Sequence, residues 1–313
     1  MQALWMVAAA FFFATMAVCV KFASEYFNSA ELVFYRGLLG MFFMWALARS
    51  RGITLATRYA GMHMWRSLVG VISLGAWFYA IAHLPLATAM TLNYMSSVWI
   101  AAFLVGGALL MGLLPARGDR VAREATSVGI TFSQGPLVLT VVTGFIGVIM
   151  MLRPTIDQNQ AFAGLVGLMS GLLAAFAYMQ VMALARVGEP ETRTVFYFAV
   201  GSAVAGALAM GVAGVSEWHW KPALWLIPLG VLASLGQLCM TRAYTRAKTR
   251  SATLVVANLQ YSGIVFGAIY SLLLFGEQLP LIGWTGMGLI MVSGIAATVL
   301  RARAAPGAPA EEH

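Results

Sequence analysis

Ten long apolar stretches, separated by short polar or proline-containing breaks, run along the chain. Most approach the roughly 20 apolar residues that a helix needs to cross the hydrocarbon of a bilayer. None alternates between apolar and polar positions, as a transmembrane β-barrel would require. We therefore predict an all-α integral membrane protein with ten transmembrane helices. They cover about residues 3–23, 30–48, 64–83, 87–110, 135–152, 161–185, 193–215, 222–243, 250–275 and 280–300.

The composition and the charges agree with this pattern. Charged residues make up 10% of the 313 residues, whereas a soluble protein carries roughly 25%. Lys and Arg remain preferentially in cytoplasmic loops. With the N-terminus inside, 15 of the 19 basic residues, Arg66 among them, fall in cytoplasmic segments and three in outer segments, and Arg36 lies within a helix. This predicts both termini in the cytoplasm and explains the net charge of +8 without a nucleic-acid partner.

The two halves of the chain share local patterns in the same order. Phe34-Tyr35 corresponds to Phe196-Tyr197, and the segment 92–94 (LNY) corresponds to 259–261 (LQY). Five helices is an odd number, so two such halves must insert with opposite orientations. We predict two inverted five-helix repeats, residues 1–156 and 157–301, followed by a disordered cytoplasmic tail, 302–313. Inverted repeats with a binding site between them are typical of secondary transporters.

Four stretches carry a family resemblance. They are 31–36 (ELVFYR), 82–94 (AHLPLATAMTLNY), 144–148 (GFIGV) with Arg153-Pro154 after it, and 275–277 (FGE). The chain resembles the drug/metabolite transporter superfamily, with two EamA-type repeats over residues 3–301. The resemblance implies multi-pass insertion in a bacterial inner membrane, alternating access, and a central cavity among helices 1–4 and 6–9. Two features depart from the family pattern: Ser96-Ser97 stands where Pro is common, and residues 111–135 form a long basic connection.

Arg36 is the sharpest candidate for binding chemistry. An ionisable residue inside the membrane is a functional hypothesis by default, and a guanidinium suits a carboxylate or phosphate. The alternative is that Arg36 bonds backbone carbonyls or extends to the surface. Glu31, one turn before Tyr35, is interpreted as a solvated acid at a helix start. His63 and His83, near helix ends, are expected at the membrane interface.

Polar and aromatic residues at inward-facing helical spacing complete the predicted substrate site, because polar groups facing lipid are costly. For each of these residues the alternative is interhelical hydrogen bonding or packing. The full predicted set is Tyr35, Arg36, Trp77, Asn93, Tyr94, Ser97, Tyr178, Tyr197, Gln237, Asn258 and Tyr261.

These observations favour a carrier for a small organic metabolite, such as an amino acid, a nucleobase or a drug-like compound. No H-E-x-x-H or G-x-S-x-G motif is present, so an embedded enzyme is not expected. A channel or a receptor without carrier activity is the alternative. No acid falls at mid-membrane, which favours facilitated diffusion or exchange, and the few charges suggest a neutral or zwitterionic solute. The expected partners are the solute and the lipid bilayer, with no cofactor or metal, and a homodimer is left open.

Overall fold

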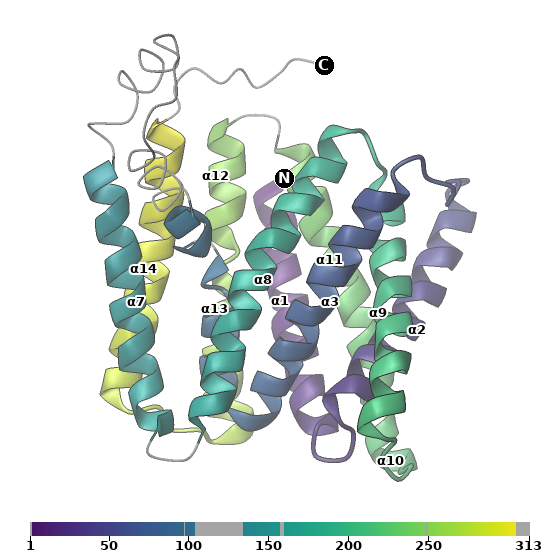
Figure 1. Ribbon diagram of the computed structural model, residues 1–313, viewed down its shortest axis with the longest axis horizontal. Coiled ribbons are helices and arrows are strands. Elements are labelled where there is room, and N and C mark those ends of the chain that lie inside the picture. The colour runs from purple at the N-terminus through teal and green to yellow at the C-terminus, as the bar shows by residue number, and fades with distance from the viewer. Residues whose placement is uncertain (1, 97, 104–133, 157–159, 248–249, 305–313) are drawn as a thin grey trace, which may run out of the picture.

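A computed structural model describes residues 2–96, 98–103, 134–156, 160–247 and 250–304. In this part of the chain the regular elements are all helices, arranged as one bundle (Figure 1). They are α1 (Gln2–Ala23), α2 (Ser29–Ser50), α3 (Ala60–His83), α4 (Leu86–Asn93), α7 (Gln134–Ile156), α8 (Ala161–Arg186), α9 (Glu191–Ala213), α10 (Trp220–Ala223), α11 (Leu226–Arg246), α12 (Arg250–Leu259), α13 (Ser262–Phe275) and α14 (Leu281–Ala304).

The bundle is that of a multi-pass membrane protein. Among the described residues, eight helices are long and apolar enough to cross a membrane, and Val138–Leu152 forms a shorter apolar helix. The predicted helix 87–110 lies only partly within the described residues, since 104–110 fall outside them. The long connection 111–135 lies almost wholly outside them as well. Helix α14 extends to Ala304, and the rest of the predicted tail is not described.

Helices from the first half of the chain pack against helices from the second half. The most extensive pairings are α2 with α9, α1 with α11, α3 with α8, and α7 with α14, and α4 packs on α13. Small residues permit these close approaches. A Cβ atom at Gly37 would overlap the backbone of α9, and one at Gly206 would lie 2.6 Å from the Cα of Phe34. The bundle is thus held together across the midpoint of the sequence.

Two helices are interrupted at corresponding places. Helix α4 ends at Asn93, a turn follows at Tyr94 and Met95, and helical backbone resumes before residues 98–103. Helix α12 ends at Leu259, and α13 begins after a turn at Gln260 and Tyr261. No proline stands at either break. The two tyrosine rings are neighbours, with centroids 6.4 Å apart, so both interruptions meet inside the bundle.

The start of α2 corrects the interpretation of Glu31. Its side chain is only 1% exposed and is not solvated. Asn28 and Glu31 form a capping box, in which Asn28 Oδ1 accepts from the Glu31 backbone N–H and Glu31 Oε2 accepts from that of Asn28. Glu31 also accepts hydrogen bonds from the backbone N–H and hydroxyl of Ser216. The favourable placement at a helix N-terminus was correctly predicted, but the carboxylate is buried because the 214–216 loop covers it.

Candidate substrate-binding site

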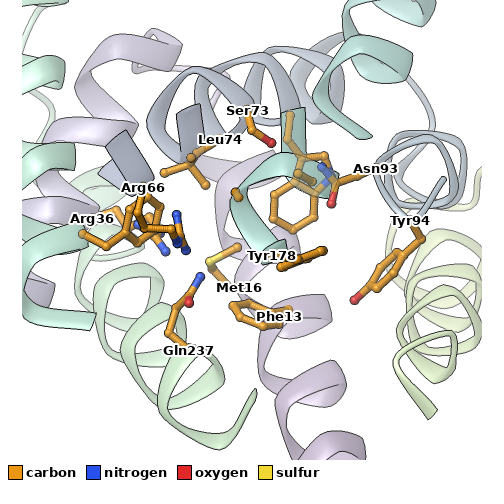
Figure 2. Close-up of a pocket in the computed structure, with 15 residues that line it drawn as sticks. Phe13, Met16, Arg36, Arg66, Ser73, Leu74, Asn93, Tyr94, Tyr178 and Gln237 are labelled. Atoms are coloured by element: carbon orange, nitrogen blue, oxygen red, sulfur yellow. The ribbon is translucent and has the colours of Figure 1, made fainter. Parts of the chain in front are cut away.

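A cavity of about 60 Å³ lies among helices from both halves of the chain (Figure 2). That volume accommodates a few water molecules. Helices α1, α2, α3, α4, α8, α9 and α11 contribute to its wall. The lining residues are Phe13, Met16, Arg36, Arg66, Gly70, Ser73, Leu74, Trp77, Asn93, Tyr94, Ala174, Ala177, Tyr178, Phe198 and Gln237.

Six of the eleven residues in the predicted substrate site line this cavity. They are Arg36, Trp77, Asn93, Tyr94, Tyr178 and Gln237, which come from five helices and one helix break. These side chains are far apart in the sequence and converge on one space, as Figure 2 shows for all of them except Trp77. Their role in binding remains a prediction, but their placement is what such a role requires.

Four other predicted residues do not line the cavity. Tyr35 packs against Trp218 and Phe27, with ring centroids 5.8 and 6.2 Å away. The Tyr197 hydroxyl donates to the Leu55 carbonyl at 2.9 Å. Asn258 is on α12, and Tyr261 lies at the second helix break, with its ring centroid 6.4 Å from that of Tyr94. Ser97, the remaining candidate, lies outside the described residues.

Arg66 is a lining residue that the sequence reasoning missed. It was counted as a cytoplasmic cation because it stands near the start of the predicted helix 64–83. In the structure α3 begins four residues earlier, at Ala60, and the side chain of Arg66 is buried, with 3% exposure. The apolar residues between Ala60 and Arg66 could have signalled the earlier start. The number of basic residues assigned to cytoplasmic segments was therefore too high by one. The number assigned to the interior of the bundle was too low by one.

Arg36 and Arg66 share one aromatic ring. Their guanidinium carbons lie 5.0 and 4.1 Å from the ring centroid of Phe198. The sum of these distances, about 9 Å, is the largest possible separation of the two charges. Gly70, one turn after Arg66, makes room for this arrangement. A Cβ atom there would overlap Arg66 Nη1 and lie 2.9 Å from Phe198 Cε2.

Neither guanidinium has an anionic partner among the described residues. Nε of Arg36, and Nε and Nη1 of Arg66, are buried without a hydrogen bond there. Two unit charges about 9 Å apart repel by about 2 kcal/mol at an effective dielectric constant of about 20. Cation–π contact with Phe198 stabilises each guanidinium by roughly 0.5–2 kcal/mol. Since desolvation costs several kcal/mol per ion, the cation–π contacts alone do not offset the cost of burying the two charges.

Hydrogen bonds fix the opposite wall. Asn93 Nδ2 donates to Ser170 Oγ at 3.1 Å, and Ser73 Oγ donates to the Ser170 carbonyl at 2.8 Å. These contacts join α3, α4 and α8, so Asn93 makes an interhelical hydrogen bond as well as lining the cavity. The indole N–H of Trp77 is buried without a hydrogen bond in the described part of the chain. This wall supplies neutral polar groups.

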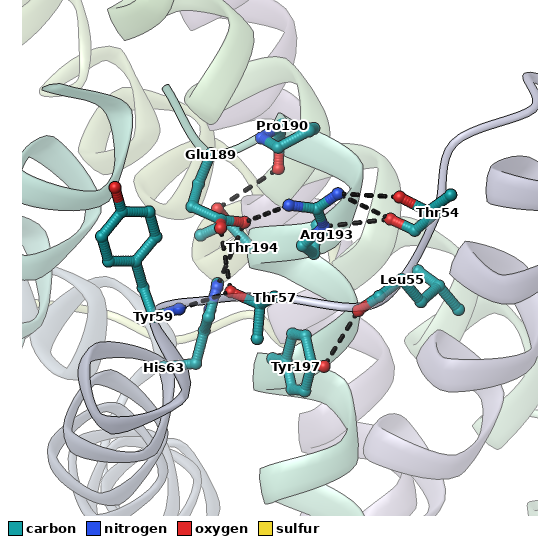
Figure 3. Close-up of polar contacts among 10 residues, drawn as sticks. All are labelled: Thr54, Leu55, Thr57, Tyr59, His63, Glu189, Pro190, Arg193, Thr194 and Tyr197. Atoms are coloured by element: carbon teal, nitrogen blue, oxygen red, sulfur yellow. Dashed lines mark hydrogen bonds and ion pairs between the residues drawn. The ribbon is translucent and has the colours of Figure 1, made fainter. Parts of the chain in front are cut away.

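A polar cluster lies at the end of the bundle where α1 begins, which is the upper end in Figure 1. Glu189, between α8 and α9, accepts from Thr57 Oγ1 at 2.8 Å and from Arg193 Nη1 at 3.0 Å (Figure 3). His63 Nε2 lies 3.4 Å from Glu189 Oε2. Arg193 also donates to the Thr54 carbonyl. His63 is 2% exposed because the 54–59 loop and Tyr197 of α9 cover the ring. Its expected position at the membrane interface stays a prediction.

The charge state of Glu189 follows from this cluster. Burial raises the pKa of its carboxyl, but hydrogen bonds from Thr57 and Arg193 and the positive charge of Arg193 outweigh that effect. The pKa therefore lies below its ordinary value of 4.5. The carboxylate is ionised near neutral pH and links the 54–59 loop to the start of α9.

A second polar cluster lies at the lower end. Lys21, near the end of α1, forms an ion pair with Glu277 and donates to the Leu84 carbonyl at 2.8 Å. Glu277 also accepts from the Leu86 backbone N–H at 2.8 Å and from the Ser271 hydroxyl. These bonds join α1, the α3–α4 turn and α13. The cavity thus lies between two polar clusters at opposite ends of the bundle.

Comparison with known proteins decides the family. The model of the EamA-like transporter family matches residues 1–106. The pseudopaline exporter of Pseudomonas aeruginosa is 32% identical over 93% of this chain and 93% of its own length. The chain belongs to the EamA-like transporter family. The resemblance inferred from the four sequence stretches is therefore confirmed.

Other EamA-type relatives agree with this assignment. A riboflavin transporter of Rhizobium johnstonii is 27% identical over 78% of this chain and 74% of its own length. A crystal structure of a protein with 17% identity superposes with a TM-score of 0.60 and covers 96% of this chain and 98% of that one. That likeness concerns the fold alone. The family and the named relatives are transporters and not enzymes. In the described residues no group of His, Cys, Asp and Glu could hold a metal ion.

Proposed function

We propose that this protein is a secondary transporter that moves a small organic metabolite across the bacterial inner membrane by alternating access. The single observation that carries the proposal is the polar, charged cavity formed by helices from both halves of a membrane-spanning bundle. Relatives named for the transport of pseudopaline and riboflavin support it. In this proposal Arg36, Trp77, Asn93, Tyr94, Tyr178 and Gln237, together with Arg66, contact the solute.

The proposed architecture is two inverted repeats of five helices, residues 1–156 and 157–301. The helix pairing supports it. If the two halves are related by symmetry, α1 corresponds to α8 and α11 corresponds to α3, so the α1–α11 pair corresponds to the α8–α3 pair, and both pairs are present. The same correspondence maps the α2–α9 pair and the α7–α14 pair onto themselves. The interruptions after Asn93 and Leu259 also correspond. Two interrupted helices that meet at a central site are typical of such carriers.

The proposed orientation places both termini in the cytoplasm. Helix α1 begins and α14 ends at the same end of the bundle (Figure 1), as an even number of spans requires. With Lys and Arg concentrated in the cytoplasmic connections, the upper end, which holds Glu189, faces the cytoplasm. The lower end, with Lys21 and Glu277, faces outward. Homodimer formation remains a prediction.

The cavity volume of about 60 Å³ is too small for most metabolites, so solute entry requires the helices to separate at one end. The clusters around Glu189 and around Glu277 each join several elements at one end only. In the proposed cycle they break alternately. A channel would require both to be open at once, which is why a carrier is favoured over the channel alternative.

Counterflow in liposomes tests this proposal. Purified protein is reconstituted with a high internal concentration of an unlabelled solute, and a trace of the labelled solute is added outside. A carrier exchanges the two and accumulates label transiently inside, with saturation as the concentration rises. Unsaturable flux with no counterflow would show a channel instead. Protein-free liposomes and liposomes containing heat-denatured protein serve as controls.

A further inference from the structure

The charges in the cavity narrow the class of solute. We infer that the site binds a solute carrying two negatively charged oxygen groups, carboxylate or phosphate, which Arg36 and Arg66 hold together. The inference rests on the proposed carrier function and names its substrate class. It departs from the neutral or zwitterionic solute that the sequence suggested, because that expectation placed Arg66 outside the bundle.

The balance of charge in the cavity favours a dianion. The two guanidiniums are 4% and 3% exposed, and no ion pair neutralises either of them within the described residues. The lining residues include no Asp or Glu. A monoanion would leave one cation uncompensated, and the amine of a zwitterion would meet positive charge without a carboxylate. A dianion neutralises both guanidiniums.

The spacing of the two guanidiniums also favours a solute with two anionic groups. The guanidinium carbons of Arg36 and Arg66 are at most about 9 Å apart, the sum of their distances to the Phe198 centroid. Each guanidinium can present two parallel N–H donors to one carboxylate or phosphate. Two anionic groups joined by a short carbon chain fit this spacing. Phe198 contacts both cations, and Nε of Arg36 and Nε and Nη1 of Arg66 have no hydrogen-bond partner among the described residues.

The remaining lining residues describe the rest of the solute. Asn93, Tyr178 and Gln237 offer neutral hydrogen-bonding groups, and Trp77 offers an indole N–H without a partner. Phe13 and Met16 provide apolar surface beside them (Figure 2). These residues therefore suit a polar but uncharged organic group beside the two anionic groups. A small dianionic metabolite with hydroxyl or amide functions matches all of these surfaces.

Ligand-induced thermal stabilisation of the purified full-length protein in detergent tests the inference. The probes are malonate, succinate, glutarate and 3-phosphoglycerate, with acetate and the neutral diamide succinamide for comparison, at matched ionic strength. We expect at least one probe with two anionic groups to bind tenfold or more tightly than acetate, and succinamide to have no effect. The succinate and 3-phosphoglycerate arms separate a dicarboxylate solute from one that carries a carboxylate and a phosphate. Acetate or succinamide binding as tightly as every dianion would overturn the inference, and so would the absence of any response to the dianions.

Variants test the two arginines. Arg36→Gln and Arg66→Gln are each expected to weaken dianion binding tenfold or more and to remove the preference over acetate. Arg242→Gln is the matched control, because its guanidinium also lies over an aromatic ring, 4.9 Å from the Trp5 centroid, but outside the cavity. If a Gln variant does not fold, the corresponding Lys variant keeps the charge and should show a smaller loss. Dianion preference that persists in both folded variants would contradict the inference.

Counterflow of the best dianion separates this inference from the carrier function. Dianion binding that depends on both arginines, without exchange in liposomes, would remove the carrier and leave the anion site. Saturable counterflow of a neutral or cationic solute by a protein that binds no dianion would leave the carrier and remove the anion site. Exchange of the dianion that is lost in the Gln variants and retained in Arg242→Gln would support both.

Discussion

Gly70 lies one turn after Arg66 on α3, and its missing side chain makes room for the Arg66 guanidinium. In Gly70→Ala the new methyl group would overlap Arg66 Nη1 and lie 2.9 Å from Phe198 Cε2. The Phe198 ring is buried at 4% exposure and contacts both arginines. The flexible arginine must therefore move away from the ring. The substitution displaces a charge without removing it.

The expected magnitudes separate binding from stability. A hydrogen bond to a charged group is worth roughly 1.5–3 kcal/mol, and each 1.4 kcal/mol is about tenfold in affinity. Dianion affinity should therefore fall roughly 10- to 100-fold. Loss of the Arg66–Phe198 contact costs roughly 0.5–2 kcal/mol, whereas Ala in place of Gly within a helix regains about 1 kcal/mol. The 2.9 Å approach of the methyl group to Phe198 Cε2 adds overpacking of roughly 1–3 kcal/mol. The free energy of unfolding should therefore fall by roughly 0.5–4 kcal/mol.

The assay is dianion titration by thermal shift, with Gly75→Ala as the control. Gly75 is on the same helix, and a Cβ atom there meets nothing within 4 Å. This control should keep the affinity of the native protein. Unchanged affinity in a folded Gly70→Ala protein would refute the idea that the position of Arg66 on Phe198 matters for binding. An equal loss in Gly75→Ala would show a general effect of alanine in α3.

Three further predictions concern stability and closure. The pKa of Glu189 is lowered in the folded protein, so the ionised carboxylate stabilises the folded state fully above about pH 4.5. This stabilisation is lost as the pH falls below that value. Melting temperatures of the native protein should therefore fall at acid pH, and those of Glu189→Gln should fall less. In Gly37→Ala the methyl group would lie 2.8 Å from a backbone oxygen of α9, and we expect destabilisation of roughly 1–3 kcal/mol by overpacking. Gly288→Ala, at an open helical position, should instead be stabilised by roughly 0.5–1 kcal/mol. Lys21→Met breaks the lower cluster and should speed modification of a cysteine placed at position 73 by an impermeant reagent added from that side; an unchanged rate would argue against a closing role.

The sequence by itself showed that this protein folds in a lipid bilayer. A bilayer requires long apolar helices and a closed set of backbone hydrogen bonds, and both requirements are visible residue by residue. The family was also readable, because stretches such as 31–36 and 275–277 are local. The side chain of Arg36 was recognised as unusual for the same reason: a single charge in an apolar run needs no knowledge of its neighbours.

Only the tertiary structure decided what Arg36 faces. Arg66 stands 30 residues further along, close enough to a helix start that its position in the sequence suggested a loop cation. Its burial depends on where α3 begins and on the missing side chain at Gly70, and its relation to Arg36 depends on Phe198, which is contributed by the second half of the chain. Periodicity reports which face of a helix is polar but not which other helices that face meets. The convergence of two cations on one ring is a product of helix packing across the whole bundle.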